Sequence, residues 1–275
     1  MSVTTRPAGV RRLACAAALG LAAACTAAAG ADSVEIYSAG SARTLVEALV
    51  KRAAPDIEIK ATFGGSGLLR ERIEGGEHPD LFLSADLGSP RKLAAAGRTV
   101  VPVVAFARNR MCLAAQGSAG VTAANLVDRM LAEDLRLRAS TPVADPAGDY
   151  AIAIFDRIDA ARPGAGRILR DKAQRMHEAA RALPPVTGVG GVAALFRDRH
   201  IDLMVTYCSA APALEKDVPG LTVLPFPPEL EPGPVYGLAV LSARPAALRV
   251  ALLLMSEDGQ AMVKQAGLLP ILEPR

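Results

Sequence analysis

The chain has 275 residues, of which 51% are hydrophobic and 21% charged, a composition typical of a globular protein. Its formal net charge of +3 is too small to indicate binding to nucleic acid or to an acidic membrane surface. It contains no Trp and only 4% aromatic residues, so it lacks the stacking surfaces on which single-stranded nucleic acids or sugars bind.

The first 31 residues differ from the rest of the chain. A positive start is followed by an apolar, Ala-rich run and then by small residues, in the segments Arg6–Arg12, Leu13–Cys25 and Ala29–Ala31. This order predicts a secretory signal peptide over residues 1–31, because the apolar run is too short for a stable membrane span. Lipid anchoring at Cys25 stays open as an alternative. In either case we expect the mature protein in the periplasm.

After residue 31, segments with strand-like and helix-like patterns alternate. Strands are predicted at 34–37, 57–63, 80–84, 103–107, 111–115, 142–144, 202–207 and 235–241. Helices are predicted at 45–50, 66–73, 123–133, from 150, within 162–185, at 189–199 and at 246–255. Repeated strand–turn–helix units favour an α/β fold with mostly parallel sheets flanked by helices.

The order of these segments predicts two lobes. Residues 32–110 and 228–275 are expected to form the first lobe, and residues 111–227 the second, with a proline-dense connection at 224–234. A lobe made of both ends of the chain, with another lobe inserted, is typical of hinged binding proteins. We therefore expect the ligand between the lobes, where strand ends and helix N-termini converge.

Two cysteines remain beyond the predicted leader, Cys112 and Cys208. In an oxidising compartment they can form a disulfide, but two cysteines do not make a disulfide framework. A disulfide and two free buried thiols are both compatible with the sequence.

Hydrolysis is poorly supported. A nucleophile elbow has the pattern G-x-S-x-G, whereas the turn around Ser66 has Leu68 in place of the last glycine. The three histidines, His78, His177 and His200, do not lie in catalytic settings. We therefore expect no enzyme, and a serine hydrolase that uses Ser66 is kept only as an alternative.

Metal and cofactor chemistry are also not expected. The histidines and cysteines lack the spacing of a metal site, and no dinucleotide or Walker motif is present. Iron capture by clustered tyrosines is disfavoured because the four tyrosines are spread along the chain, at Tyr37, Tyr150, Tyr207 and Tyr236.

A small polar or glycine-rich turn that leads into a helix occurs four times, at 38–41, 64–67, 145–148 and 187–190. The first amides of a helix are unpaired and carry partial positive charge, so several converging N-termini can bind an anion. A single turn of this kind is usually only a helix cap. Four of them in a secreted two-lobe chain predict an anion site.

These segments resemble the periplasmic molybdate-binding proteins of ABC importers, the ModA-type family. The likeness spans the mature chain and rests on the segments Ile36–Ser41, Thr62–Leu68, Pro79–Asp86, Phe106–Met111, Asp145–Ala151 and Met255–Gln260. It implies the two-lobe periplasmic-binding-protein fold of type II, with the ligand cleft between the lobes.

In that family an oxyanion is held by serine hydroxyls, backbone amides and a tyrosine hydroxyl. Motif by motif, the resemblance places these roles on Ser41, Ser66, Ala147, Val189 and Tyr207. Val189 and Tyr207 are 207 − 189 = 18 residues apart, as in the family's helix–strand unit. Gly40 and Asp149 are less certain members of the site.

The function that the resemblance implies is capture of molybdate or tungstate and delivery to an inner-membrane ABC permease with its ATPase. We expect a monomer that closes its lobes around the anion, with no cofactor, no nucleic-acid partner and no metal except that of the oxyanion. The alternatives are another oxyanion, such as sulfate, and an organic anion. A sensory effector domain is disfavoured by the predicted leader.

Two residues depart from the family pattern. Asp149 adjoins the proposed ligand turn, where its carboxylate either points away from a dianion or joins the metal centre of the anion. Arg43 follows the first turn and either lies near the cleft or is solvated on the helix face. The stretch between Ala147 and Val189 is also longer than is usual in the family.

Overall fold

The computed structural model of the chain describes residues 1–4, 32–180 and 188–272, and all of its helices and strands belong to the unit formed by residues 31–275. Most of the predicted signal peptide, including Cys25, therefore lies outside the described residues. In the described part of the chain, no helix has the length and apolar character that crossing a membrane requires.

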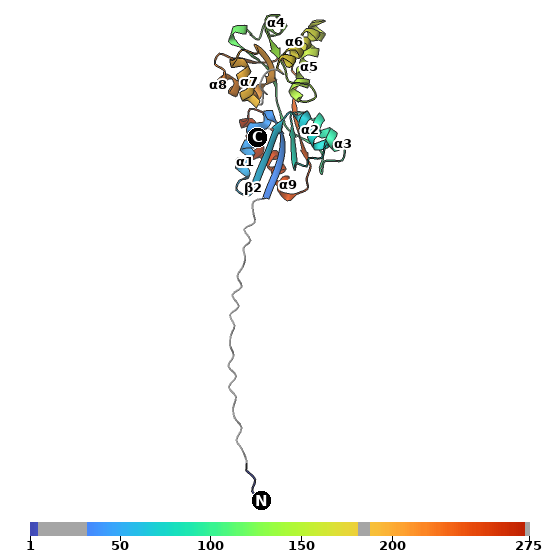
Figure 1. Ribbon diagram of the computed structural model, residues 1–275, viewed down its shortest axis with the longest axis vertical. Helices are drawn as coiled ribbons and strands as arrows, with labels where there is room; N and C mark the ends of the chain where they lie inside the picture. The colour runs from blue at the N-terminus through green and yellow to red at the C-terminus, as the bar shows by residue number, and fades with distance from the viewer. Residues whose placement is uncertain (5–31, 181–187, 273–275) are drawn as a thin grey trace. The chain divides into compact units, whose positions relative to one another are not determined.

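In the described part of the chain, the larger sheet has six strands in the order β10-β4-β9-β3-β1-β2. β1 pairs parallel with β2 and with β3, whereas β9 pairs antiparallel with β3 and with β4. The strands are β1 (Asp32–Ala39), β2 (Ile57–Gly64), β3 (Leu81–Ser84), β4 (Val104–Arg108), β9 (Val235–Val240) and β10 (Leu269–Pro270). With its helices, this sheet forms what we call the first lobe (Figure 1).

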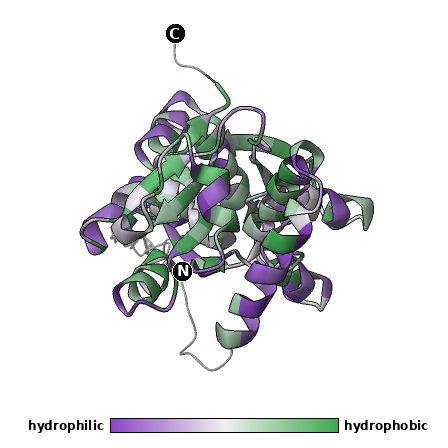
Figure 2. Ribbon diagram, turned by 90° about the horizontal axis from the view of Figure 1, so that it is seen from above, coloured by the Kyte–Doolittle hydropathy of each residue, from purple (hydrophilic) through white to green (hydrophobic). Residues whose placement is uncertain are grey.

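Helices cover both faces of the larger sheet. Successive strand residues point to opposite faces, so Ile36 packs with Leu45 of α1 while Tyr37 packs with Leu69 of α2. One face is covered by α1 (Arg43–Ala53), α9 (Pro245–Met255) and α10 (Glu257–Gln265), and the other by α2 (Ser66–Glu74) and α3 (Gly88–Ala95). Both faces are thus apolar, and in Figure 2 hydrophobic residues predominate in the interior whereas hydrophilic residues lie mainly on the outer helices.

The second lobe contains a smaller sheet, which among the described residues has the strand order β6-β7-β5-β8. Its strands are β5 (Met111–Ala115), β6 (Leu137–Arg138), β7 (Leu203–Tyr207) and β8 (Thr222–Pro225). Its helices are α4 (Leu126–Leu131), α5 (Pro146–Ala161), α6 (Ala165–Ala180), α7 (Gly188–Arg197) and α8 (Ala211–Asp217). Leu113 and Val205 pack toward α4, α5 and α6, whereas Ala114 and Met204 pack toward α7 and α8.

The α/β fold is confirmed, but both sheets are mixed and not mostly parallel. β4 carries the chain out of the first lobe and β9 carries it back, so these neighbours run in opposite directions and pair antiparallel. The same holds in the second lobe for β5 and β8. Parallel pairing is limited to β1 with β2, β1 with β3, and β6 with β7 in the described residues.

The predicted strand at 142–144 is wrong. The short strand lies earlier, at Leu137–Arg138, and residues 142–144 form a turn that is closed by a hydrogen bond from the Asp145 amide to the Thr141 carbonyl. Val143 has φ of 70°, which no strand residue adopts. The three consecutive apolar residues there lie in the turn before α5 and not in a sheet.

Cys112 and Cys208 form a disulfide, with their Cα atoms 5.0 Å apart. Cys112 lies opposite Thr206 in the β5–β7 pairing, and Cys208 begins the 3-10 helix η3 (Cys208–Ala210) that follows β7. Of the two alternatives that the sequence left open, the structure therefore has the disulfide. A crosslink over 96 residues stabilises a fold by about 2–4 kcal/mol.

Candidate functional site

Two of the helix-initiating turns lie at one edge of the larger sheet. β1 and β2 are parallel and in register, with Ala39 opposite Gly64, so both strands end at that edge. The chain then enters the 3-10 helix η1 (Gly40–Ala42) after β1, and α2 after β2. Parallel pairing therefore brings the turns that contain Ser41 and Ser66 next to each other.

Ser41 is the end of a buried chain of hydrogen bonds. Asn109 donates from Nδ2 to the Tyr236 hydroxyl at 3.0 Å, and that hydroxyl donates to Ser41 Oγ at 2.7 Å. Tyr236 and Asn109 are 0% and 3% exposed. Because Ser41 Oγ accepts a hydrogen bond from the protein, its own proton is available to an acceptor outside this chain.

Ser66 has a similar arrangement. It is fully buried at the first turn of α2, and its Oγ accepts a hydrogen bond from the Ala85 amide at 3.0 Å. The Ala85 carbonyl in turn accepts from the Tyr150 hydroxyl at 3.4 Å. Among the described residues, no histidine forms a hydrogen bond with Ser66.

Three tyrosines converge beside these serines. The ring centroids of Tyr207 and Tyr236 are 5.8 Å apart, and those of Tyr150 and Tyr207 are 6.4 Å apart. The expectation that the tyrosines stay apart is therefore wrong for these three, because the end of β7, the start of β9 and the first turn of α5 meet here. Tyr37 lies on the opposite face of the larger sheet, among the residues under α2 and α3.

The Tyr207 hydroxyl is buried and has no hydrogen-bond partner within the described ranges. Burial raises the pKa of Tyr207 well above its usual value, and the neighbouring Tyr236, Asp145, Tyr150 and Asp86 add to the shift. Burial likewise raises the pKa of Tyr150 to about 12, and it raises the pKa of Tyr236. All three hydroxyls thus keep their protons at neutral pH.

In the first turn of α5, a carboxyl group of the protein accepts a hydrogen bond from the Ala147 amide, which the resemblance assigned to the anion. Asp145 is the N-cap of α5, and its Oδ1 accepts a hydrogen bond from the Ala147 amide at 3.0 Å. Burial raises the pKa of Asp145, and the carboxylates of Asp149 and Asp86 raise it further, whereas hydrogen bonds from Ala147 and Ser140 lower it. The first free amide of α5 is therefore already bonded to a carboxyl group of the protein.

The residues that departed from the family pattern have defined contacts. The Asp149 carboxylate accepts a hydrogen bond from the Val143 amide at 2.9 Å, so it is turned toward the loop before α5. The Arg43 guanidinium lies over the Phe63 ring, with Cζ 3.9 Å from the ring centroid. Gly40 is half-buried at the start of η1.

The described contacts do not link Val189, a predicted site residue, to the others. It lies near the start of α7 and packs against the cluster that contains Met204 and Phe196. Ser41, Ser66, Ala147 and Tyr207 are linked through Tyr236, Tyr150, Ala85 and Asp145. We call the hydroxyls of Ser41, Ser66 and Tyr207 the donor cluster.

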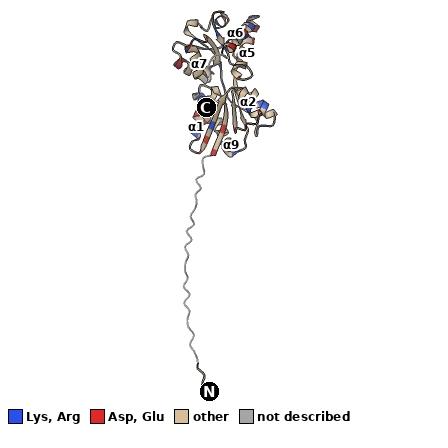
Figure 3. Ribbon diagram, in the orientation of Figure 1, with Lys and Arg blue, Asp and Glu red and all other residues tan. Residues whose placement is uncertain are grey.

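Other polar groups have structural roles. A cavity of about 620 Å³ lies near the start of β1 and β3, and two of the carboxylates that line it form ion pairs, Asp80 with Arg244 at 3.1 Å and Glu77 with Arg72 at 2.7 Å. None of the predicted site residues lines it. Both signs of charge occur on each lobe (Figure 3), which agrees with the small net charge.

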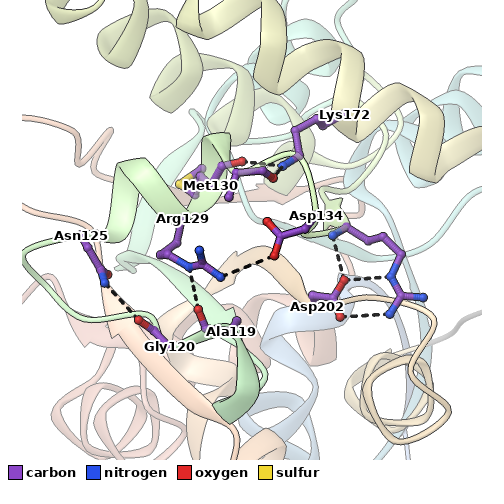
Figure 4. Close-up of polar contacts among 10 residues, drawn as sticks. Ala119, Gly120, Asn125, Arg129, Met130, Asp134, Lys172 and Asp202 are labelled. Atoms are coloured by element: carbon purple, nitrogen blue, oxygen red, sulfur yellow. Dashed lines mark hydrogen bonds and ion pairs between the residues drawn. The ribbon is translucent and has the colours of Figure 1, made fainter.

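A polar cluster in the second lobe caps helix α4. Lys172 is 5% exposed, and its ammonium donates to the carbonyls of Met130, at 2.9 Å, and Ala132 (Figure 4). Nearby, Arg136 forms two side-chain bonds with Asp202, at 2.8 and 3.0 Å. These contacts satisfy helix-end carbonyls and a loop carboxylate, so they hold the lobe together and do not form a ligand site.

The residues that support the donor cluster were not predicted from the sequence. Tyr236 and Asn109 carry no local motif, because they matter only through contacts with Ser41 across the chain. Asp145 does carry a signal, since an aspartate immediately before a proline is typical of a helix N-cap.

Comparisons with known proteins were consistent with this fold. The family model described as bacterial extracellular solute-binding protein matches residues 34–269. An uncharacterized protein of Pasteurella multocida is 35% identical over 243 residues, which cover 86% of this chain and 98% of that protein.

Two solved structures share the fold at low sequence identity. The periplasmic molybdate-binding protein of Azotobacter vinelandii has a TM-score of 0.65 at 18% identity, over 88% of this chain and 100% of that one. PEB3, known from Campylobacter jejuni and solved with L-phospholactate, has a TM-score of 0.66 at 12% identity, over 86% and 99%.

Proposed function

Because the chain belongs to the family of bacterial extracellular solute-binding proteins, we propose that the donor cluster binds an oxyanion, with molybdate and tungstate as the first candidates. Family membership itself makes this an extracytoplasmic binding protein of ABC-type import, whose partners are a small ligand and a permease. We further propose that it works in the periplasm as a monomer and needs no cofactor.

The observation that carries the proposal is the Tyr207 hydroxyl. A buried hydroxyl without a hydrogen-bond partner costs free energy, and the described part of the chain offers Tyr207 none. An acceptor oxygen of a ligand removes this cost. Tyr207 is also a residue on which the resemblance to molybdate-binding proteins places a ligand contact.

The two serines support an acceptor-rich ligand. Each Oγ already accepts a hydrogen bond, from Tyr236 at Ser41 and from the Ala85 amide at Ser66, so each serine can offer its proton. A tetrahedral oxyanion has acceptors on all sides and no need to donate. Hydrogen bonds to a charged acceptor are stronger than those to a neutral one, so neutral hydroxyls suffice to hold a dianion.

Isothermal titration of the mature chain with molybdate, tungstate, sulfate and phosphate tests the proposal. We expect sub-micromolar binding of molybdate and tungstate. No binding of any of the four anions contradicts an inorganic oxyanion site. A screen for ester hydrolysis that is lost in Ser66→Ala would instead favour the hydrolase alternative.

Asp145 favours a second candidate, an anion that also donates a hydrogen bond. Its carboxylate sits on the Ala147 amide and repels a fully ionised dianion, but it can accept from a hydroxyl or a protonated phosphate. PEB3, which shares the fold, was solved with L-phospholactate, a phosphorylated organic acid. Titration with phospholactate beside molybdate separates the two candidates: tighter binding of the organic phosphate favours the second.

A further inference from the structure

The loop before α5 carries a backbone contact between the two lobes. The Leu68 amide of α2, in the first lobe, donates to the Ala144 carbonyl of the second lobe at 3.3 Å. Leu68 is in the first turn of α2, where amides have no partner within the helix, and the N-cap Gly65 makes no side-chain cap. The second lobe therefore caps a helix of the first.

This contact is close enough to require glycine on the α2 side. A Cβ atom added at Gly67 would lie 1.8 Å from the Val143 carbonyl oxygen, and one at Gly65 would lie 2.3 Å from the Ala144 carbonyl oxygen. Both oxygens are backbone atoms, so they cannot move without moving the loop. The glycines of this turn thus allow two backbones to meet across the lobes.

On the other side, the loop is held in an unfavourable conformation. Val143 has φ of 70°, a left-handed conformation that is rare for a β-branched residue, and its side chain is 65% exposed, so packing does not impose it. What holds it is the first turn of α5. The Asp149 carboxylate accepts from the Val143 amide at 2.9 Å.

The rest of the loop is tied to the same turn of α5. The Asp145 amide donates to the Thr141 carbonyl at 3.0 Å, and a Cβ atom at Gly148 would lie 2.5 Å from the Ser140 carbonyl oxygen. The loop is therefore packed closely on the helix start. Its carbonyls at Val143 and Ala144 face the α2 turn.

We propose that Asp149 is a positioning residue for lobe closure, which holds Val143 in the left-handed conformation so that the loop carbonyls latch onto the α2 turn at Gly65–Leu68. The latch is made of backbone groups and lies beside Ser66, so closing it brings the Ser66 turn and the first turn of α5 together. The inference rests on the proposed function only in taking closure as the binding motion.

The latch is tested without any ligand, by hydrogen exchange of the Leu68 amide measured by NMR. We expect this amide to be protected in the wild type. In Gly67→Ala its protection factor should be at least tenfold lower. Gly88→Ala is the matched control, because Gly88 also begins a helix and an added Cβ meets only the Asp86 side chain, at 3.9 Å. A wild-type Leu68 amide that exchanges as fast as in Gly67→Ala overturns the latch.

The role of Asp149 is tested by rescue. Asp149→Ala should reduce the protection of Leu68, and Asp149→Asn should retain it, because the amide oxygen of Asn can still accept from Val143. Adding Val143→Gly to Asp149→Ala should restore protection, since glycine adopts positive φ without support. If Asp149→Ala protects Leu68 as well as the wild type does, or if Val143→Gly fails to restore protection, Asp149 does not position the loop.

Ligand titration then separates this inference from the proposed function. We expect Gly67→Ala to bind the anion at least tenfold more weakly than Gly88→Ala, with both variants folded by circular dichroism. Loss of Leu68 protection in Gly67→Ala, together with no anion binding by the wild type, keeps the latch and rejects the proposed ligand. Equal affinity of the two variants shows that the latch does not serve binding and overturns its proposed role.

Discussion

The helix N-termini of the two lobes differ in whether their hydrogen-bond donors are free for a ligand. At η1 in the first lobe, protein groups donate to Ser41, so its hydroxyl proton is left for an external acceptor. At α5 in the second lobe, the Asp145 carboxylate accepts from the Ala147 amide, so this donor is already used. A helix N-terminus is therefore not in itself an anion site, because the cap decides whether the amide is available.

The two helix N-termini also differ in the charge of the groups around them. Around Ser41 the supporting groups are neutral, namely the Tyr236 hydroxyl and the Asn109 amide. Around Ala147 the pKa of Asp145 is raised by burial and by two further carboxylates, Asp149 and Asp86. An anion that approaches the first-lobe side meets hydroxyl donors, whereas on the second-lobe side it meets carboxyl groups. Four changes test this contrast.

The largest effect is expected from Ser41→Ala. It removes a donor to the ligand, and affinity should fall by about 1.5–3 kcal/mol, the usual contribution of a hydrogen bond to a charged group. It also leaves the buried Tyr236 hydroxyl without its acceptor, which should lower the free energy of unfolding by a further ~1–3 kcal/mol. Titration calorimetry and denaturant unfolding measure the two losses.

Ser209→Ala is the control for this change, because Ser209 accepts from the same Asn109 side chain at 2.9 Å but is outside the donor cluster. It should lower stability slightly and leave affinity unchanged. If Ser41→Ala binds the anion as tightly as Ser209→Ala, Ser41 only supports Tyr236.

Tyr207→Phe should separate binding from stability. The affinity should again fall by about 1.5–3 kcal/mol. The free energy of unfolding should stay the same or rise, because a buried hydroxyl that has no partner among the described residues is removed. Tyr37→Phe, on the other face of the larger sheet, is the matched control and should leave affinity unchanged. A large loss of stability in Tyr207→Phe would mean that its hydroxyl has a structural partner.

Asp145→Asn should make the side chain that caps the α5 N-terminus neutral, as the groups around Ser41 are. Asn can still cap α5 through its side-chain oxygen, but it has no charge. At neutral pH we expect fully ionised oxyanions to bind roughly threefold to tenfold more tightly. Asp149→Asn is the control, since its carboxylate faces the Val143 amide. Weaker binding of a phosphorylated acid by Asp145→Asn, with no gain for molybdate, would support the second candidate ligand.

The same variant has a pH signature. The pKa of Asp145 is raised in the folded state from its ordinary value of 3.8, mainly by burial. Its contribution to stability is therefore complete below pH 3.8 and is lost as the pH rises through the folded pKa. Asp145→Asn should accordingly be more stable than the wild type at neutral pH, and the difference should shrink as the pH approaches 4, which melting curves at several pH values can show.

The smallest effect concerns the tyrosines. The pKa of Tyr150 is raised from 10.0 to about 12, so this hydroxyl stays protonated where an exposed tyrosine ionises. Its contribution to stability is present below pH 10 and is lost as the pH rises toward 12. Ultraviolet titration should show a phenolate signal that appears near pH 12 in the wild type and is missing in Tyr150→Phe. Ionisation of all tyrosines near pH 10 would contradict the burial of this cluster.

Part of this architecture can be predicted from local pattern. The alternation of strands and helices indicates the α/β class, and the placement of Ser41 and Ser66 after parallel neighbouring strands predicts that their turns are adjacent. Both inferences rest on short-range regularities, which a single sequence displays.

What could not be predicted depends on contacts across the chain. Tyr150, Tyr207 and Tyr236 meet only because α5, β7 and β9 end at one place, and no spacing between them signals this. The mixed sheets follow from the chain crossing twice between the lobes. The left-handed conformation of Val143 has no sequence signal either, because a β-branched residue between apolar neighbours is typical of a strand.

The disulfide has a practical consequence for preparing the protein. Of the four cysteines, Cys15 and Cys25 lie in the predicted leader, so a chain that starts at Asp32 has one possible intramolecular pairing. With the leader retained, four cysteines allow three pairings, two of which leave Cys112 and Cys208 unjoined. Oxidative refolding of the shortened chain therefore cannot yield scrambled monomers, whereas refolding of the full chain can.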